Sequence, residues 1–332
     1  MTKHIYIYSP SGAVRDKAAF KCGIARLEAL GHCVEVDEAA LNRFQRFAGD
    51  DQTRLAAIHR AADSGADVAL ISRGGYGLTR ILPVIDYAKI ATAIEHGTQF
   101  VGISDFTAFQ NAVLTQTGSV TWAGPALCEG FGVRAELPDD IMLACFDDLM
   151  LGQGQGAGWR QNRHILKNAT NSIAINAYPS SVTGTFDVEN SVLWGGNLTV
   201  LTSLMGTPYF PNIDRGILFV EDVAEHPYRI ERMMTQLLYA GVLARQNAIV
   251  MGQFTDFKLQ VHDDGFRLQT VVDWLRSQLN VPILTNLPYG HIATKVLLPV
   301  GASVDVFVDG RDAMIFWGHG GCVSPEHISC VI

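Results

Sequence analysis

The first 125 residues alternate short apolar segments with segments of helical periodicity, and this alternation constrains the fold most strongly. Strands are predicted at 4–8, 33–36, 67–72, 99–103 and 119–122. Between them, Phe20, Ile24 and Leu27 recur at helical spacing, and a second helix is predicted over 54–62. Such alternation predicts a parallel sheet covered by helices, in which ligands bind beyond the carboxyl ends of the strands.

One serine lies at such a strand end. Ser104 follows an apolar strand and precedes an apolar helix that begins near Phe106, while Gly74 and Gly75 follow the strand before it. A side chain at a strand-to-helix turn is lifted out of the sheet beside helix N–H groups that lack partners, which suits a nucleophile. Ser and Asp are also the commonest helix N-caps, so a capping role for Ser104 and Asp105 fits equally well.

The chain changes character after about residue 135. A helix is predicted over 138–150, a glycine-rich linker over 152–158 and a polar stretch to 185. The second half predicts strands at 216–220, 247–252, 282–285, 296–299, 303–308 and 313–317, and a helix over 229–241. The expected architecture is α/β: an N-terminal parallel-sheet domain (1–135), a helix and linker (136–185) and a C-terminal strand-rich α+β domain (186–332), with the active site at the domain interface.

Charge and composition exclude some partners. The net charge is −8 and no run of Lys or Arg occurs, so neither nucleic acid nor an anionic membrane is an expected partner. The N-terminal segment reads as a strand and turn rather than a signal peptide, which predicts a cytoplasmic protein with reduced cysteines. A structural metal is an open alternative at four C-terminal residues with metal-ligand side chains: His319, Cys322, His327 and Cys330.

A serine nucleophile needs a base, and the base needs a group that orients it. Among the ten histidines, His291 follows a turn-rich approach after a predicted strand. Glu221 ends an apolar strand, where a carboxylate is unfavourable unless it has a partner. A capping role or a salt bridge would also explain Glu221. In the salt-bridge alternative, the partner of Glu221 is Arg229 or Arg232. Glu225 and Glu231 are weaker candidates for the acid that orients the base.

Short motifs extend over nearly the whole chain. They are 9–12 (SPSG), 73–77 (RGGYG), 80–82 (RIL), 102–108 (GISDFTA), 124–125 (GP), 194–198 (WGGNL), 206–208 (GTP), 221–227 (EDVAEHP), 232–233 (RM), 290–291 (GH) and 298–301 (LPVG). In content and order they resemble the L,D-carboxypeptidases of serine peptidase family S66. Within that family the chain is most similar to the murein tetrapeptide carboxypeptidases of bacterial cell-wall recycling.

The resemblance implies a Ser–Glu–His triad at Ser104, Glu221 and His291. Ser104 would be the nucleophile and His291 the general base, and Glu221 would hold the imidazole in the required tautomer. The N–H groups near Gly75 and of Asp105 are the implied oxyanion hole. The implied reaction needs no metal and no organic cofactor. It releases the C-terminal D-alanine from murein tetrapeptides during peptidoglycan recycling, and the resemblance also implies a homodimer.

A D-alanine terminus presents a carboxylate and a methyl group, so its pocket needs a cation or convergent N–H donors. The candidates by motif position are Tyr76, Arg80, Trp194, Asn197 and Arg232. For two of them another role is equally open. Trp194 would pack in the core, and Arg232 would pair with a nearby acid, Glu225 or Asp222.

Three other functions stay open. A sister group of the same family confers self-immunity by cleaving aminoacyl-nucleotide or peptide-nucleotide antibiotics. An α/β-hydrolase shares the order of nucleophile, acid and base, but Phe106 stands where G-x-S-x-G has its second glycine. A two-domain periplasmic-type binding protein also closes a cleft between α/β lobes, but it would need an export signal.

Overall fold

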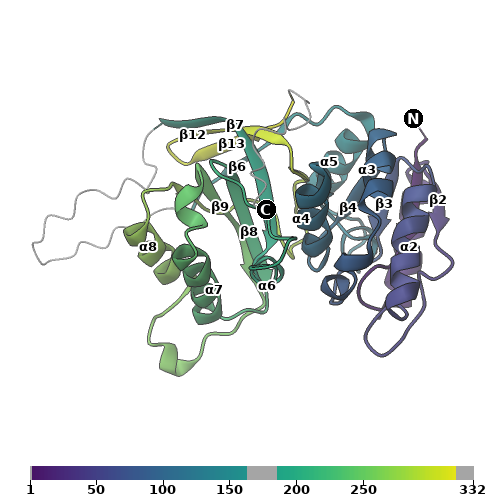
Figure 1. Cartoon of the computed structure of the whole chain (residues 1–332), viewed down its shortest axis with the longest axis horizontal. Helices are drawn as coiled ribbons and strands as arrows, with labels where there is room; N and C mark the ends of the chain where they lie inside the picture. The colour runs from purple at the N-terminus through teal and green to yellow at the C-terminus, as the bar shows by residue number, and fades with distance from the viewer. Residues whose placement is uncertain (1, 163–184, 319–332) are drawn as a thin grey trace, which may run out of the picture.

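The alternating first third of the chain forms a parallel sheet, as the sequence predicts. In the computed structural model, which describes residues 2–162 and 185–318, the first sheet has the order β11-β5-β4-β3-β1-β2 (Figure 1). Its strands are β1 (His4–Tyr8), β2 (Cys33–Val36), β3 (Val68–Ile71), β4 (Gln99–Gly102), β5 (Thr121–Ala123) and β11 (Leu298–Val300). The first five run parallel, and β11 pairs antiparallel with β5.

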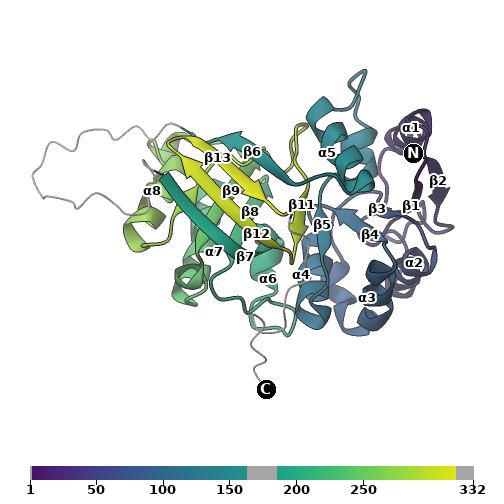
Figure 2. The same cartoon turned by 90° about the horizontal axis from the view of Figure 1, so that it is seen from above.

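Helices cover both faces of the first sheet (Figure 2). One face carries α1 (Lys17–Ala29) and α5 (Asp140–Leu151), and the other carries α2 (Asp51–Asp63), α3 (Tyr87–Glu95) and α4 (Phe106–Thr117). Alternation along β1 explains the two layers, because successive side chains point to opposite faces. Ile5 and Ile7 pack with α1 and α5, whereas Tyr6 and Tyr8 pack with the helices of the other face.

The second sheet is mixed, with the order β10-β9-β8-β7-β12-β13-β6. Its strands are β6 (Gly156–Arg160), β7 (Thr185–Asn197), β8 (Ile217–Val223), β9 (Ala248–Thr255), β10 (Ile283–Leu284), β12 (Ser303–Asp309) and β13 (Asp312–Phe316). Strands β7 to β10 pair parallel and the others antiparallel. Its helices are α6 (Leu198–Ser203), α7 (Pro227–Tyr239) and α8 (Leu268–Gln278). The two sheets confirm the predicted α/β class with a strand-rich second part.

Helix α4 lies between the two sheets (Figures 1 and 2). Every residue from Phe106 to Leu114 is buried, and the helix packs on β7 and α6. Most of these residues are apolar, and the buried Asn111 donates to the Thr107 and Gly195 oxygens, so the helix is suited to the interior of the protein. The turn before α4, which follows a strand of the first sheet, therefore lies next to the second sheet.

Three expectations about the second half were wrong in detail. The end of the expected glycine linker forms β6, where the backbone approaches β13 so closely that a Cβ on Gly156 would lie 2.4 Å from the Ile315 oxygen. The strand expected at 296–299 joins the first sheet as β11. Strand β8 continues through Glu221 to Val223, with an irregular register between Val220 and Asp222.

Short helical turns complete the fold. They are the 3₁₀ turns η1 (Leu78–Arg80), η2 (Leu82–Val84), η4 (Leu243–Arg245) and η5 (Val261–Asp263), and the π turn η3 (Leu127–Phe131). No helix in the described ranges has both the length and the hydropathy that crossing a membrane requires.

Candidate active site

Ser104 stands at the turn between β4 and α4 with a left-handed backbone, φ 68°. A positive φ is uncommon for a residue with a side chain, and such strain concentrates at functional turns. The half-buried serine packs against Gly74, where a Cβ would lie 2.5 Å from the Ser104 Cβ and 2.8 Å from its Oγ. The turn therefore holds the hydroxyl against the glycine loop that follows β3.

The helix-cap interpretation of Ser104 and Asp105 was wrong. Asp105 occupies the N-cap position of α4 but makes no side-chain cap hydrogen bond. Its Oδ2 instead accepts from the Ser11 hydroxyl at 2.7 Å and the Leu78 N–H at 3.0 Å. Burial raises the pKa of the Asp105 carboxyl, which is 1% exposed. This carboxyl thus fastens the serine turn to the loops after β1 and β3.

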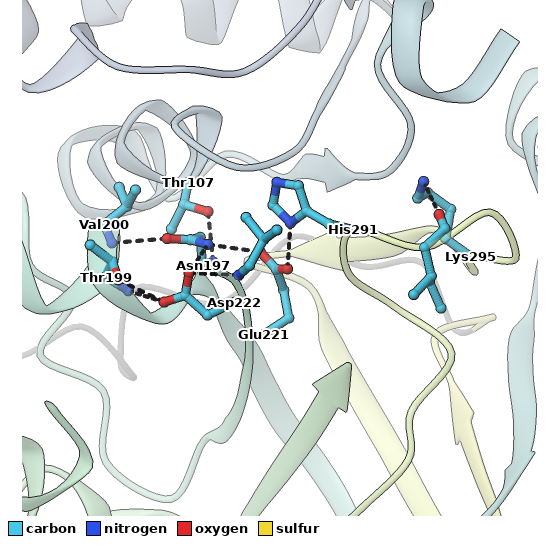
Figure 3. Close-up of polar contacts among 10 residues, drawn as sticks. Thr107, Asn197, Thr199, Val200, Glu221, Asp222, His291 and Lys295 are labelled. Atoms are coloured by element: carbon cyan, nitrogen blue, oxygen red, sulfur yellow. Dashed lines mark hydrogen bonds and ion pairs between the residues drawn. The ribbon is translucent and has the colours of Figure 1, made fainter. Parts of the chain in front are cut away.

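Glu221 and His291 form a hydrogen-bonded pair (Figure 3). The Glu221 carboxyl is fully buried, and its Oε2 lies 2.8 Å from His291 Nδ1. Because Nδ1 faces the carboxylate, the other ring nitrogen points away from Glu221. The predicted alternative of a salt bridge is not found in the described ranges, since Arg229 pairs with Glu225 at 3.6 Å.

Opposing effects set the protonation of His291. Burial lowers the pKa of its imidazole. The hydrogen bond and charge of Glu221, with Glu129 and Asp222 adding to them, raise the pKa by more, so the net shift is upward. The pair thus favours the imidazolium form more than an isolated histidine would.

Asn197 orients the buried carboxyl of Glu221 (Figure 3). Its Nδ2 donates to Glu221 Oε1 at 3.1 Å and to Asp222 Oδ1 at 3.0 Å. Its backbone N–H donates to Thr107 Oγ1 at 2.9 Å. Thr107 lies one helical turn after Ser104, so this chain of contacts links the serine turn to the acid–base pair.

The loop that carries His291 is held by one hydrogen bond within itself and by one to the start of α5. The Lys295 Nζ donates to the Ile292 oxygen at 2.5 Å, and the Thr294 hydroxyl donates to Asp139 Oδ2 at 2.5 Å. Lys295 is 2% exposed, and burial lowers the pKa of its amine. Sequence reasoning gave no role to Thr107, Thr294 or Lys295. Thr107 lies inside the motif at 102–108 and the other two follow the motif at 290–291, and a hydroxyl or an amine there carries no distinctive pattern.

The oxyanion-hole candidates have the backbone that such a role needs. Gly75 is exposed with φ 124°, and a Cβ there would lie 3.0 Å from the Gly12 Cα. Within the described residues, neither the Gly75 N–H nor the Asp105 N–H has a hydrogen-bond acceptor. Unpartnered donors beside a serine can bind an oxyanion.

The predicted substrate contacts divide into two groups. Tyr76 and Arg80 are exposed beside Gly75, and Arg232 is exposed on α7. Trp194 is 0% exposed, and its indole N–H donates to Gln246 Oε1 at 2.9 Å. Its assignment as a substrate contact was therefore wrong, and the core alternative holds. Asn197 is 4% exposed, and its side-chain N–H groups donate to Glu221 and Asp222.

A cavity of about 420 Å³ lies away from these residues. It is lined by Gln99 at the start of β4, by Trp122 and Trp317, and by residues of α5 and β11. Ser104 follows the opposite end of β4, so this cavity is separate from the site. No group of three or more potential metal ligands occurs among the described residues. The tail group His319, Cys322, His327 and Cys330 lies outside them.

Sequence models of two domains match the chain: the LD-carboxypeptidase N-terminal domain at residues 5–124 and the LD-carboxypeptidase C-terminal domain at 190–306, both of peptidase family S66. A Bacillus subtilis protein named "probable murein peptide carboxypeptidase" is 29% identical over 290 residues, covering 87% of this chain and 84% of its own. The solved structure of muramoyltetrapeptide carboxypeptidase from Oxalobacter formigenes has a TM-score of 0.80 and 36% identity, covering 94% and 98%. The microcin C7 self-immunity protein of Escherichia coli is 26% identical over 257 residues, covering 73% and 71%.

Proposed function

The chain belongs to the LD-carboxypeptidase family, peptidase family S66, and from this premise we propose that it is a serine L,D-carboxypeptidase acting on murein tetrapeptides. The bond cleaved would join an L-configured residue to the C-terminal D-alanine. The observation that carries the proposal is the buried Glu221–His291 pair, linked through Asn197 to the strained Ser104 turn. Family membership sets aside the α/β-hydrolase and binding-protein alternatives.

In the proposed reaction the Ser104 hydroxyl attacks the scissile carbonyl carbon. His291, through its nitrogen opposite Glu221, takes the hydroxyl proton as the Ser–carbon bond forms. It then gives that proton to the D-alanine nitrogen as the carbon–nitrogen bond breaks. A water molecule, with His291 again as the base, then attacks the acyl carbon. The bond to the serine oxygen breaks as His291 returns the proton to Ser104. No hydrogen bond joins Ser104 and His291 in the described structure, and such contacts commonly tighten only when substrate binds.

The surrounding groups support these steps electrostatically. Glu221 accepts from His291 Nδ1, which fixes the tautomer and stabilises the imidazolium formed during attack. The Gly75 and Asp105 N–H groups are proposed to bind the oxyanion. Loss of one such donor typically lowers turnover by about 10²–10³. Asn197 keeps the Glu221 carboxyl from rotating, and so acts as a positioning residue.

Self-immunity by cleavage of a peptide–nucleotide antibiotic is a second candidate, favoured by the similarity to the microcin C7 self-immunity protein. The two candidates differ in the leaving group but share the triad. Incubation with a murein tetrapeptide and with a peptide–nucleotide conjugate separates them, because only the preferred substrate is cleaved at low enzyme concentration. A homodimer stays a prediction of the family resemblance, and a cytoplasmic location stays a prediction from the sequence.

Replacing the proposed nucleophile tests the mechanism. We expect Ser104→Ala to reduce D-alanine release from an L,D-terminated tetrapeptide by at least about 10³-fold, because the hydroxyl forms the acyl-enzyme. The control is Ser277→Ala on the exposed side of α8, which should retain activity. Thermal melting should match the wild type for both variants. A Ser104→Ala protein with full turnover would refute the triad.

A further inference from the structure

A row of arginine and aromatic side chains lies beside the glycine loop that faces Ser104. The Arg46 Cζ lies 5.6 Å from the Tyr76 ring centre, and that ring lies 5.9 Å from the Phe47 ring. The Arg80 Cζ lies 5.1 Å from the Phe47 ring. We call Arg46, Phe47, Tyr76 and Arg80 the arginine rim. Tyr76 is 44% exposed and both arginines are exposed, so a ligand can reach them.

The arginine rim is continuous with the serine turn. Gly12 forms a β-bridge with Phe47, and its N–H donates to the Gly74 oxygen at 3.2 Å. Gly74 packs against Ser104, and Tyr76 lies two residues further along the same loop. Ser104 and the arginine rim therefore border the same glycine loop.

The rim concentrates positive charge in an acidic chain, whose net charge is −8. Asp51 accepts from Arg80 at 2.8 Å and is shared with the buried Arg54. Arg46 forms no ion pair among the described residues, although its charge acts to lower the pKa of the buried Asp105 carboxyl against the larger effect of burial. A guanidinium stacked on an aromatic ring keeps its N–H edge free, and that edge matches a carboxylate in geometry and charge.

The rim offers two guanidinium groups rather than one, since Arg46 lies over the Tyr76 ring and Arg80 over the Phe47 ring. The C-terminal D-alanine of the proposed substrate has a single carboxylate. We propose that the arginine rim binds a free carboxylate on the acyl side of the substrate, upstream of the bond that is cleaved. The proposal rests on the proposed function and adds a preference for acidic peptides.

Two tetrapeptides that differ in one group test the rim. Both end in D-alanine, and the second residue is D-glutamate with either a free α-carboxylate or its amide. We expect the wild type to show at least about tenfold higher kcat/KM for the carboxylate form, and the ratio to shrink in 0.5 M salt as charges are screened. In Arg46→Gln and Arg80→Gln the ratio should fall towards one.

The matched control is Arg215→Gln, an exposed arginine just before β8, at the end opposite Glu221; it should keep the wild-type ratio. Binding to Ser104→Ala provides a readout that does not need cleavage, and the carboxylate peptide should bind about tenfold more tightly. Equal binding of both peptides, or equal losses of kcat/KM for both peptides in Arg46→Gln, would overturn the proposal that the rim binds a carboxylate. A binding preference without D-alanine release would instead reject the proposed function and retain the rim.

Discussion

Ser104 adopts a left-handed backbone conformation that glycine would adopt without strain, and this conformation determines where the serine hydroxyl lies. The conformation persists because neighbouring groups leave no alternative. Gly74 closes in from one side, and the buried Asp105 carboxyl binds two other loops. Backbone strain of this kind contributes a cost of about 1–3 kcal/mol, which the surrounding fold must offset.

The protonation of His291 predicts the pH dependence of activity. A general base works only when neutral, and Glu221 raises the pKa of His291, so kcat/KM should fall on acidification through a pKa above the reference value of about 6.5. The acid limb then lies higher than an unperturbed histidine would give. In Glu221→Gln the limb should move to lower pH, and turnover should fall by about 10⁴ through loss of the tautomer.

A pH–rate profile of kcat/KM measures both effects. The matched control is Glu225→Gln, because Glu225 was a rival acid in the sequence and pairs with Arg229 instead. It should leave the acid limb unchanged. A limb that stays in place in Glu221→Gln, or moves in Glu225→Gln, would contradict the assigned pair.

Among single residues, the sequence predicted the candidate site residues that lie at the ends of strands. It did not predict roles that depend on tertiary packing. Ser104 and Glu221 were visible because a polar group at or beyond an apolar strand needs a reason. Trp194 and Asn197 lie in one short motif, yet one is in the core and the other binds Glu221. Only the position of β7 between α4 and β8 separates those roles. Local sequence does not contain that position.

The critical element is α4, because it joins the serine turn to the second sheet. Its side chains approach β7 so closely that a Cβ on Gly196 would lie 2.5 Å from Thr107 Oγ1. Asn111 donates to the Gly195 oxygen at 2.8 Å. These contacts fix the distance between the helix and the strand end that carries Asn197.

Removal of one α4 contact should weaken this attachment. In Thr107→Val the Asn197 N–H loses its acceptor and stays buried, which should lower the free energy of unfolding by about 1–3 kcal/mol. Urea denaturation measures the change. The control is Thr115→Val, whose hydroxyl donates only to carbonyl oxygens and leaves no N–H unpaired. Equal losses in both variants would show that the contact has no special role.

Element types were easier to predict than element partners. The strands of the first sheet are apolar runs bounded by turns, and all six begin and end within two residues of the predicted bounds. Glycine-rich β6 has poor strand propensity and forms because β13 presents an unpaired edge. No local sequence pattern indicated that the strand at 296–299 would join the first sheet rather than the second, since an edge of either sheet can accept a short apolar strand.

At the scale of the whole molecule, the chain crosses between the sheets more than once. After the second sheet has begun, β11 returns to pair with β5, and β12 then rejoins β7. One buried core extends from α2 through α4 to β8 and β9. The two parts should therefore be thermodynamically coupled.

Coupling predicts a single unfolding transition. Trp122 lies on β5 of the first sheet and Trp194 on β7 of the second. Fluorescence of two variants, each retaining one of these tryptophans, should report the same urea midpoint as far-UV circular dichroism. Midpoints that differ beyond error would show that the sheets unfold independently.

The short path from His291 to β11 has a mechanical consequence. The segment after His291 is bonded to Asp139 through Thr294 and then enters the first sheet, which also carries Ser104. A hinge that drew the nucleophile away from the imidazole would have to break that bond and strip an edge strand from its neighbour. We therefore expect the proposed nucleophile and base to keep their relative positions. The proposed preference for a D-terminus would then come from a shape that is set before the substrate binds.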